Sequence, residues 1–170
     1  MIEMRVMGIA LDTRTGSPIV VLNDKENRKA LPIWIGSAEA SAIIRRIENI
    51  PSIRPMTHDL FMQISEKSGY EISRVEINDV DDSTYFASIF MYNEELQKEI
   101  EIDSRPSDAI AIALRADIPI YVTTNVLATG LVSTDVEKDE QEATEFKNFI
   151  KDIKPSDFEK LLKKNFESDQ

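Results

Sequence analysis

A strand-to-helix junction that occurs twice, at a spacing of 67 residues, constrains the fold of this chain most. Residues 33–43 and 100–110 both read as the apolar end of a strand, a serine, and the first turns of a helix. A serine before an apolar helix is typical of an N-cap, because its hydroxyl accepts from an orphan amide. Two explanations stay open: internal duplication of a three-strand-plus-helix unit, or the general likeness of such junctions.

Apolar periodicity predicts the elements around these junctions. In the first half, period-two alternation predicts strands over 2–11, 19–22 and 29–35, then a helix over 38–47 with Ser37 as its cap. After two prolines, Thr57 is expected to cap a second helix that ends near Gly69.

The second half predicts strands over 70–77, 84–92 and 96–102, a helix over 104–116 with Pro106 in its first turn, and a last strand over 118–122. The first two of these strands are expected to be joined by a turn over 78–82, and the second to be covered on both faces. The expected fold class is therefore α+β, with two β-meander-plus-helix halves forming a mixed sheet core.

Basic residues change type near residue 136. Residues 1–135 hold nine arginines and four lysines, whereas residues 136–170 hold seven lysines and no arginine. The sequence thus predicts a main domain over 1–135 and a helical C-terminal tail over 136–170, with amphipathic helices over 142–153 and 155–165. The apolar faces of the tail helices favour a homodimer.

Composition and missing motifs exclude several classes of protein. The chain has no cysteine, which excludes disulfides, thiolate zinc sites and cysteine nucleophiles. Its net charge of −11 and pI of about 4.6 argue against a long basic track along a nucleic-acid duplex, though a local basic pocket stays open. Neither a membrane-spanning run nor a signal peptide is found, so a soluble cytoplasmic protein with no membrane partner is expected. The motifs of dinucleotide-binding proteins, P-loop NTPases, zincins and serine hydrolases are also missing.

The single histidine, His58, is the first candidate for chemistry. One histidine cannot form a multi-histidine zinc site, but it can act as a general acid or base because its pKa lies near neutrality. The other interpretation is a solvent-facing residue in the first turn of a helix. The neighbouring Asp59 is a helix-stabilising charge, a metal ligand or the anchor of an arginine, and spacing does not separate these roles.

The second candidate is the segment 103–110, which reads DSRPSDAI where a strand leads into a helix. Free amides at a helix N-terminus favour an anion, and the guanidinium of Arg105 suits a phosphate. Asp103 and Asp108 carry the oxygen ligands that hard divalent cations prefer. Ordinary capping with an Arg105–carboxylate salt bridge is the competing interpretation.

Three segments together resemble the bifunctional nuclease (BFN) domain family. They are residues 31–36 (LPIWIG) with Glu39-Ala40, residues 54–60 (RPMTHDL), and residues 103–110 followed by Pro119-Ile120. Their order and spacing agree with the family over roughly residues 1–130. Ser104 stands where the family usually has alanine.

The resemblance implies a nuclease that acts on DNA and RNA, as reported for plant relatives. It implies phosphodiester hydrolysis at the mouth between the two halves, with His58, Asp59 and Asp108 as catalytic residues. Arg54, Arg105 and Ser107 would bind the substrate, and Asp59, Asp103 and Asp108 would hold Mg²⁺ or Mn²⁺, which activates water. The other hypothesis is a non-catalytic binding or regulatory module, in which the arginines and aspartates form a structural network or a small-anion site.

Overall fold

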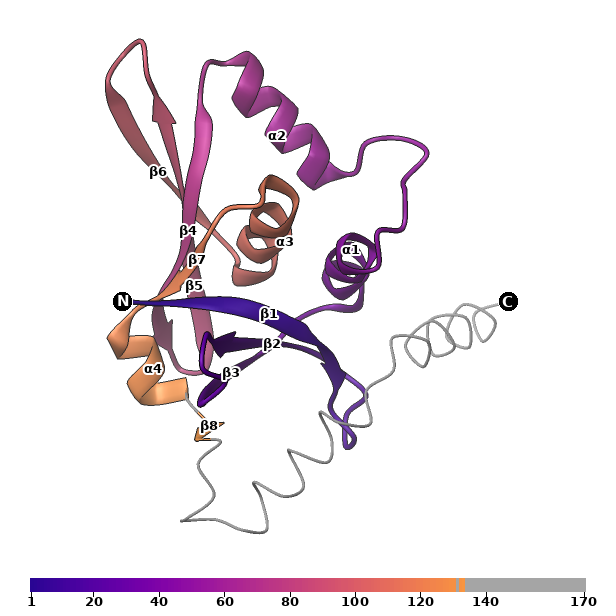
Figure 1. Ribbon diagram of the computed structural model, residues 1–170. Helices are drawn as coiled ribbons and strands as arrows, with labels where there is room; N and C mark the ends of the chain where they lie inside the picture. Colours follow the sequence, from indigo (N-terminus) through magenta and orange to yellow (C-terminus); the bar gives the residue numbers. More distant parts are fainter. Residues whose placement is uncertain (131, 134–170) are drawn as a thin grey trace.

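The computed structural model describes residues 1–130, 132 and 133, which form an eight-stranded sheet and four helices (Figure 1). The strands are β1 (Ile2–Leu11), β2 (Pro18–Asp24), β3 (Lys29–Trp34), β4 (Glu71–Asp81), β5 (Thr84–Asn93), β6 (Lys98–Ser104), β7 (Ile120–Val122) and β8 (Val132–Ser133). The helices are α1 (Ser37–Ile47), α2 (Thr57–Lys67), α3 (Pro106–Ala116) and α4 (Thr124–Gly130).

The sheet consists of two antiparallel meanders joined through β7. Its strand order is β6-β5-β4-β7-β1-β2-β3-β8, and only β4 and β7 are parallel neighbours. The meander β1-β2-β3 is followed by α1, which packs on β1 and β2, and β4-β5-β6 is followed by α3, which packs on β4 and β5. Both halves therefore repeat one order of elements, and the predicted α+β class with a mixed sheet is confirmed.

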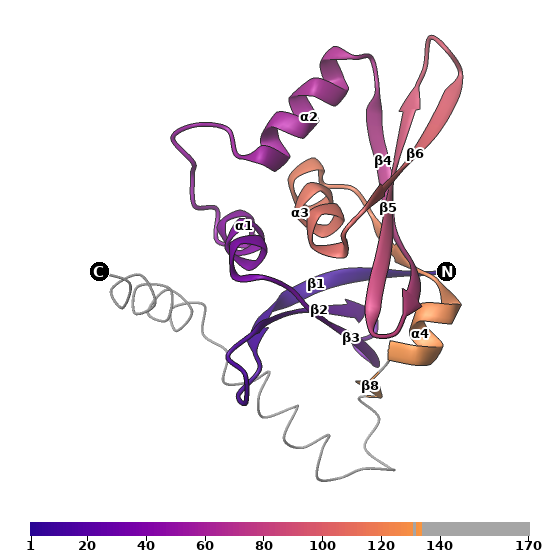
Figure 2. The ribbon, with the colours of Figure 1, turned by 180° about the vertical axis from the view of Figure 1, so that it is seen from behind.

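The three longer helices lie together on one side of the sheet. Figures 1 and 2 show α1, α2 and α3 in the concave space between the two meanders, whereas α4 lies on the other side, against β3 and β4. The core between the sheet and these helices includes the fully buried side chains of Leu22, Leu31, Ile43, Ile77 and Ile110. Each such side chain contributes about 1.5–3 kcal/mol on burial, so this core holds α1 and α3 in a fixed relation.

The predicted capping residues are wrong. Ser37 and Thr57 are the first residues of α1 and α2, and the N-cap positions belong to Gly36 and Met56. Ser104 is the last residue of β6, where its hydroxyl donates to the carbonyl oxygen of Ala87 at 3.4 Å instead of capping α3. A hydroxyl caps only from the residue before the first helical one, and these residues are displaced from that position.

Contacts and backbone conformations other than a serine or threonine cap fix the start of α2 and both ends of α3. A carboxylate oxygen of Asp59 accepts from the backbone N–H of Met56 at 2.8 Å, which satisfies one amide at the start of α2. Pro106 occupies the first turn of α3 as predicted, and Asp117 ends that helix in the left-handed conformation, with φ 55°. These contacts fix the turns that carry the candidate motifs.

The hairpin between β4 and β5 corrects the predicted turn over 78–82. The strand pairing runs on to Asp81 and Thr84, and the turn consists of Asp82 and Ser83, with φ 43° and 64°. Positive φ at both positions is typical of a tight two-residue hairpin. Asn78 lies at a β-bulge between Ile77 and Asp79, and its side-chain amide donates to the Ser88 hydroxyl at 2.8 Å.

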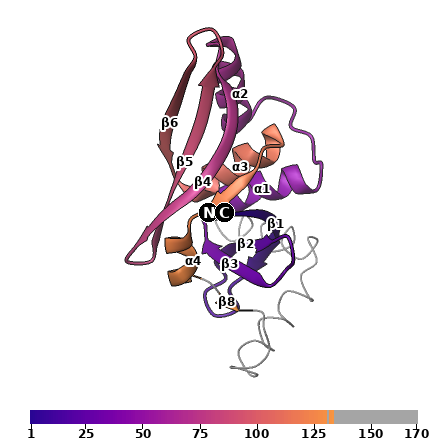
Figure 3. The ribbon, with the colours of Figure 1, turned by 60° about the vertical axis from the view of Figure 1, so that its left-hand side comes forward.

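The prediction that β5 is covered on both faces is also wrong. Phe86 and Tyr92 remain 41% and 36% exposed. Because they alternate along the strand with residues that are buried in the core, such as Met91, they lie on the face of the β4–β5–β6 ribbon that turns away from α3. Figure 3 shows the ribbon with α3 on its other face. Polar contacts replace a covering helix there: the guanidinium of Arg74 lies 3.8 Å from the centroid of the Phe90 ring and donates to Glu99 at 2.7 Å. A cation over an aromatic face shields the ring without an apolar partner.

The sequence did not predict α4 or the short strand β8, which pairs with β3. The predicted tail helices over 142–153 and 155–165 lie outside the described residues. Among the described helices, none combines the length and the apolar character needed to cross a membrane.

Candidate functional site

The two candidate motifs meet where the first turns of α1, α2 and α3 converge. Nε2 of His58 in α2 lies 3.3 Å from Oδ1 of Asp108 in α3. Nε of Arg105 donates to Oδ2 of Asp108 at 2.7 Å, and Nη1 of Arg105 donates to Glu39 of α1 at 2.8 Å. We call Glu39, His58, Arg105 and Asp108 the motif cluster; it joins the two halves of the fold through one arginine.

The motif cluster holds charges that stabilise one another. Burial raises the pKa of the Asp108 carboxyl, but hydrogen bonds and positive charge from Arg105 and His58 outweigh it, so this pKa lies below its usual value. The hydrogen bond and charge of Asp108, assisted by Glu39, raise the pKa of Arg105. In the cluster, the guanidinium of Arg105 therefore lies between the side chains of Glu39 and Asp108.

His58 is oriented by Asp108 and is largely shielded from solvent. Its side chain is only 13% exposed, so the solvent-facing interpretation is wrong. Nδ1 is buried and has no hydrogen-bond partner among the described residues, whereas Nε2 faces the carboxylate. A carboxylate that holds an imidazole in place is a recurring feature of acid–base sites. A reacting group would meet the ring at its Nε2 edge.

Asp59 anchors an arginine, one of the three roles left open by its position in the sequence. Its Oδ1 accepts from Nε of Arg115 at 3.0 Å, and the Arg115 side chain is only 8% exposed. Arg115 also donates to the carbonyl oxygens of Ala42 in α1 and Ala111 in α3. The pair thus ties all three helices together beside the motif cluster.

The three predicted metal ligands, Asp59, Asp103 and Asp108, do not come together. Asp103 is exposed near the end of β6, and strand alternation directs it to the face opposite Ser104. In the described part of the chain, no group of three or more histidine, aspartate or glutamate side chains is placed to hold a metal ion. Mg²⁺, however, often binds one or two carboxylates together with phosphate oxygens and water. Glu39 and Asp108, which share Arg105, are a donor pair of that kind.

The predicted substrate-binding residues lie in three different settings. Arg105 belongs to the motif cluster and its side chain is 65% exposed. Ser107 is 6% exposed and packs inside the first turn of α3. Arg54 is exposed in the loop between α1 and α2, where it makes no hydrogen bond or ion pair with any residue that the structure describes.

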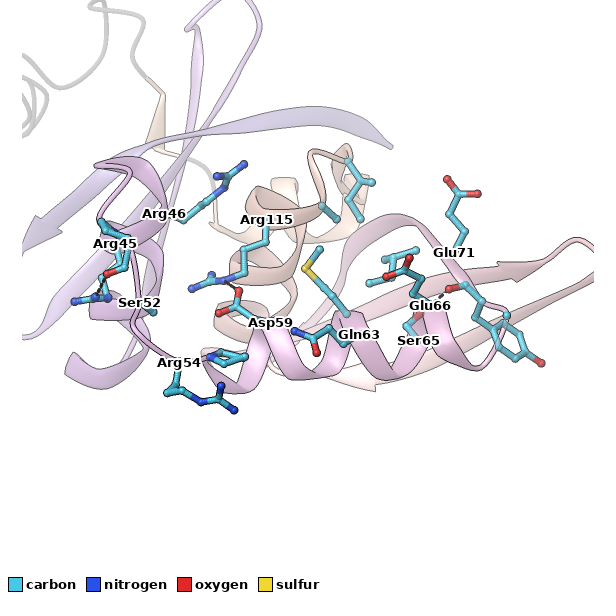
Figure 4. A pocket seen from close by; sticks show the side chains of 18 of the residues that line it. Arg45, Arg46, Ser52, Arg54, Asp59, Gln63, Ser65, Glu66, Glu71 and Arg115 are labelled. Atoms are coloured by element: carbon cyan, nitrogen blue, oxygen red, sulfur yellow. Dashed lines mark hydrogen bonds and ion pairs between the residues drawn. The ribbon is translucent and has the colours of Figure 1, made fainter.

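A large groove lies beside the motif cluster. It has a volume of about 1370 Å³ and runs between the C-terminal ends of α1 and α3, the loop from α1 to α2, and α2 with the start of β4. Figure 4 shows Arg45, Arg46, Arg54 and Arg115 at one end of the groove and Glu66 and Glu71 at the other. Asp59 lines this groove, but no residue of the motif cluster does.

Sequence reasoning gave no role to Glu39, Arg115, Arg45 or Arg46. A signal for Arg115 was present, because it lies seven residues after Asp108 and so on the same face of a helix. Glu39 belonged to the segments that carry the family resemblance, but no role was assigned to it. Its contact with Arg105 joins residues 66 apart in sequence and needs the tertiary fold.

Comparison with known proteins places these motifs in a family. A family model described as the bifunctional nuclease domain matches residues 20–135. Two Mycobacterium tuberculosis proteins described as uncharacterized, MT1877 and Rv1829, are 36% identical over 165 residues, which is 92% of this chain and 97% of theirs. Bifunctional nuclease 2 of rice (Oryza sativa subsp. japonica) is 32% identical over 107 residues, 62% of this chain and 33% of that protein. Bifunctional nuclease 1 of Arabidopsis thaliana is 29% identical over 127 residues, 69% of this chain and 39% of that protein.

Proposed function

Since this chain belongs to the bifunctional nuclease domain family, we propose that it is a nuclease that hydrolyses phosphodiester bonds in DNA or RNA. One observation carries the proposal: His58 and Asp108, from two separate family motifs, are in contact 3.3 Å apart beside an exposed arginine. An acid–base group and a guanidinium are the groups that phosphodiester hydrolysis needs close together.

In the proposed mechanism every residue of the motif cluster takes part, and Asp108 has two roles. Nε2 of His58 exchanges its contact with Asp108 for a substrate or water oxygen and transfers a proton there, and the nearby charge of Asp108 stabilises the protonated ring. Arg105 offers its exposed guanidinium to a phosphate oxygen. A divalent ion, Mg²⁺ or Mn²⁺, would be held by Glu39 and Asp108 and would supply charge neutralisation and a more acidic bound water.

The test is cleavage of labelled single-stranded DNA, duplex DNA and RNA in the presence of Mg²⁺, Mn²⁺ or EDTA. Wild type, His58→Ala and Asp108→Asn are compared with Glu26→Gln, which removes a carboxylate from the distant turn between β2 and β3. We expect cleavage by wild type and by Glu26→Gln, its loss in EDTA, and its loss in both cluster variants with folded far-UV spectra. Equal cleavage by all four proteins would indicate a contaminating nuclease and contradict the proposal.

A specific observation favours a second candidate, a non-catalytic module. All four carboxylate oxygens of Asp59 and Asp108 already accept hydrogen bonds from Arg105, Arg115, His58 or a backbone amide. Such a network binds α1, α2 and α3 together without any substrate. The same assay separates the two, because this candidate predicts no cleavage by wild type.

A further inference from the structure

Three arginines that no carboxylate neutralises gather at one end of the groove. Of the nine arginines of the chain, Arg14, Arg28, Arg74, Arg105 and Arg115 each pair with an acidic side chain, and Arg5 donates to the side chain of Asn27. Arg45, Arg46 and Arg54 have no acidic partner among the described residues, and all three line the groove. In a chain of net charge −11, this gathering is a local positive site.

Two of these arginines are held in place by groups that leave their charge intact. Arg45 donates from Nη2 to the carbonyl oxygen of Pro51 at 2.7 Å, and Arg46 donates from Nε to that of Leu114 at 2.9 Å. A guanidinium has five N–H donors, so each keeps most of them for a ligand. The α1 dipole accounts for basic residues in its last turn, but Arg54 lies outside any helix.

The other end of the groove has a different character. Tyr70, just before β4, lines it. Glu66 and Glu71 lie at this end (Figure 4). Aromatic faces stack on bases of single strands, whereas the carboxylates repel phosphates and accept hydrogen bonds from base amino groups. At about 1370 Å³ the groove exceeds the roughly 300–1,000 Å³ of small-molecule pockets.

We propose that this groove binds a short single-stranded segment of nucleic acid, with phosphates at Arg45, Arg46 and Arg54 and bases toward Tyr70. The inference rests on the proposed function for the class of ligand, and places binding outside the motif cluster. The acidic end limits the number of phosphates held and disfavours a duplex, whose two charged backbones cannot both avoid the carboxylates.

Binding in EDTA, where no metal-dependent cleavage occurs, tests the groove separately from catalysis. Fluorescence anisotropy is measured with labelled oligothymidylates of about 2 to 12 nucleotides, because single-strand sites span about 4–16 nucleotides in known folds. We expect affinity to stop rising beyond about four nucleotides, and a duplex to bind more weakly. The slope of log K against log salt should be near −2, since each phosphate contact on a single strand contributes about −0.7.

Matched variants locate the site. Arg54→Ala should weaken binding about tenfold and make the slope shallower by about 0.7, and Tyr70→Leu should weaken it about fivefold or more. Their controls are Arg14→Ala, on the exposed turn after β1, and Phe86→Leu, on the outer face of β5; both should bind as wild type does. Thermal melts confirm that each variant is folded.

Equal weakening by the control and groove variants would overturn the groove assignment, as would duplex binding as tight as single-strand binding. Binding of thymidine monophosphate as tight as that of the tetranucleotide would reduce the site to a phosphate site and overturn the strand assignment. If the groove variants lose binding while wild type cleaves nothing, the groove stands and the nuclease proposal fails. If wild type cleaves and Arg54→Ala binds normally, the nuclease proposal stands and the groove assignment fails.

Discussion

His58 and Asp108, fifty residues apart in the sequence, lie 3.3 Å apart between Nε2 and Oδ1 and connect the first turns of α2 and α3. Arg105 holds the same carboxylate through two further hydrogen bonds, at 2.7 and 3.2 Å. One side chain therefore serves both as the orienting group for the only histidine and as an ion-pair partner. Activity and stability at this site depend on the same atoms, and variants must be assessed for both.

The first prediction concerns the stability contribution of Asp108. Asp108→Asn weakens the contacts with Arg105 and His58, so we expect a loss of about 1–2 kcal/mol in the free energy of unfolding. This is small beside the total stability of a typical domain, and the variant should stay folded at room temperature. Urea unfolding, followed by circular dichroism, measures this loss of stability. Glu26→Gln is the control, and its unfolding midpoint should equal that of wild type. Failure of Asp108→Asn to fold would assign the motif a mainly structural role.

The second prediction concerns pH. The folded state lowers the pKa of Asp108 below 3.8, so its stabilising contribution is complete above the unfolded pKa and is lost as the pH falls through the folded-state value. The difference in unfolding free energy between wild type and Asp108→Asn should therefore be smaller at about pH 3 than at about pH 5. Other acids with lowered pKa values, Asp12 and Glu99, are present in both proteins and cancel. A difference that grows in acid would contradict the ion-pair network.

The third prediction concerns Asp59 and Arg115. Asp59→Ala leaves the guanidinium of Arg115, which is only 8% exposed, without its carboxylate, and it frees the Met56 amide. We expect a loss of about 2–4 kcal/mol. Arg115→Met should cost less, because Asp59 is 34% exposed and water solvates the remaining carboxylate. A double-mutant cycle measured by urea unfolding should give a combined loss smaller than the sum; strict additivity would show that the two side chains do not interact.

Local patterns predicted most of the helices and strands, because strand alternation and helical periodicity depend on residues that are close together in the sequence. β1, β2, β3 and β5 lie close to the predicted ranges, and α3 ends at Ala116 as predicted, with Pro106 in its first turn. The turn over 78–82 was predicted too early because polar residues read as a turn. In the structure, Asn78 finds a partner in Ser88 across the hairpin.

The site was only partly predictable for a different reason. The sequence marked His58, Arg105 and Asp108, but their contact depends on α1 and α3 packing together, a long-range arrangement that no local pattern encodes. Sequence reasoning gave Arg115 no role, and only the fold shows that its charge is buried against Asp59. The resemblance to a family marked candidate residues, and the fold shows how some of them meet.

The last prediction concerns Glu39, which the fold brings to Arg105. A side chain at Gly36 would collide with the carboxylate of Glu39, so Gly36→Ala displaces that flexible group with little effect on folding. If Glu39 positions Arg105 and contributes to the metal site, Gly36→Ala and Glu39→Gln should both lower cleavage by roughly 10–100-fold. Their melting temperatures should stay near that of wild type. Ser37→Ala is the matched control, because this exposed serine makes no capping hydrogen bond and its loss should change neither cleavage nor melting. Full activity in Glu39→Gln would remove Glu39 from the mechanism and leave its ion pair a purely structural contact between α1 and the start of α3.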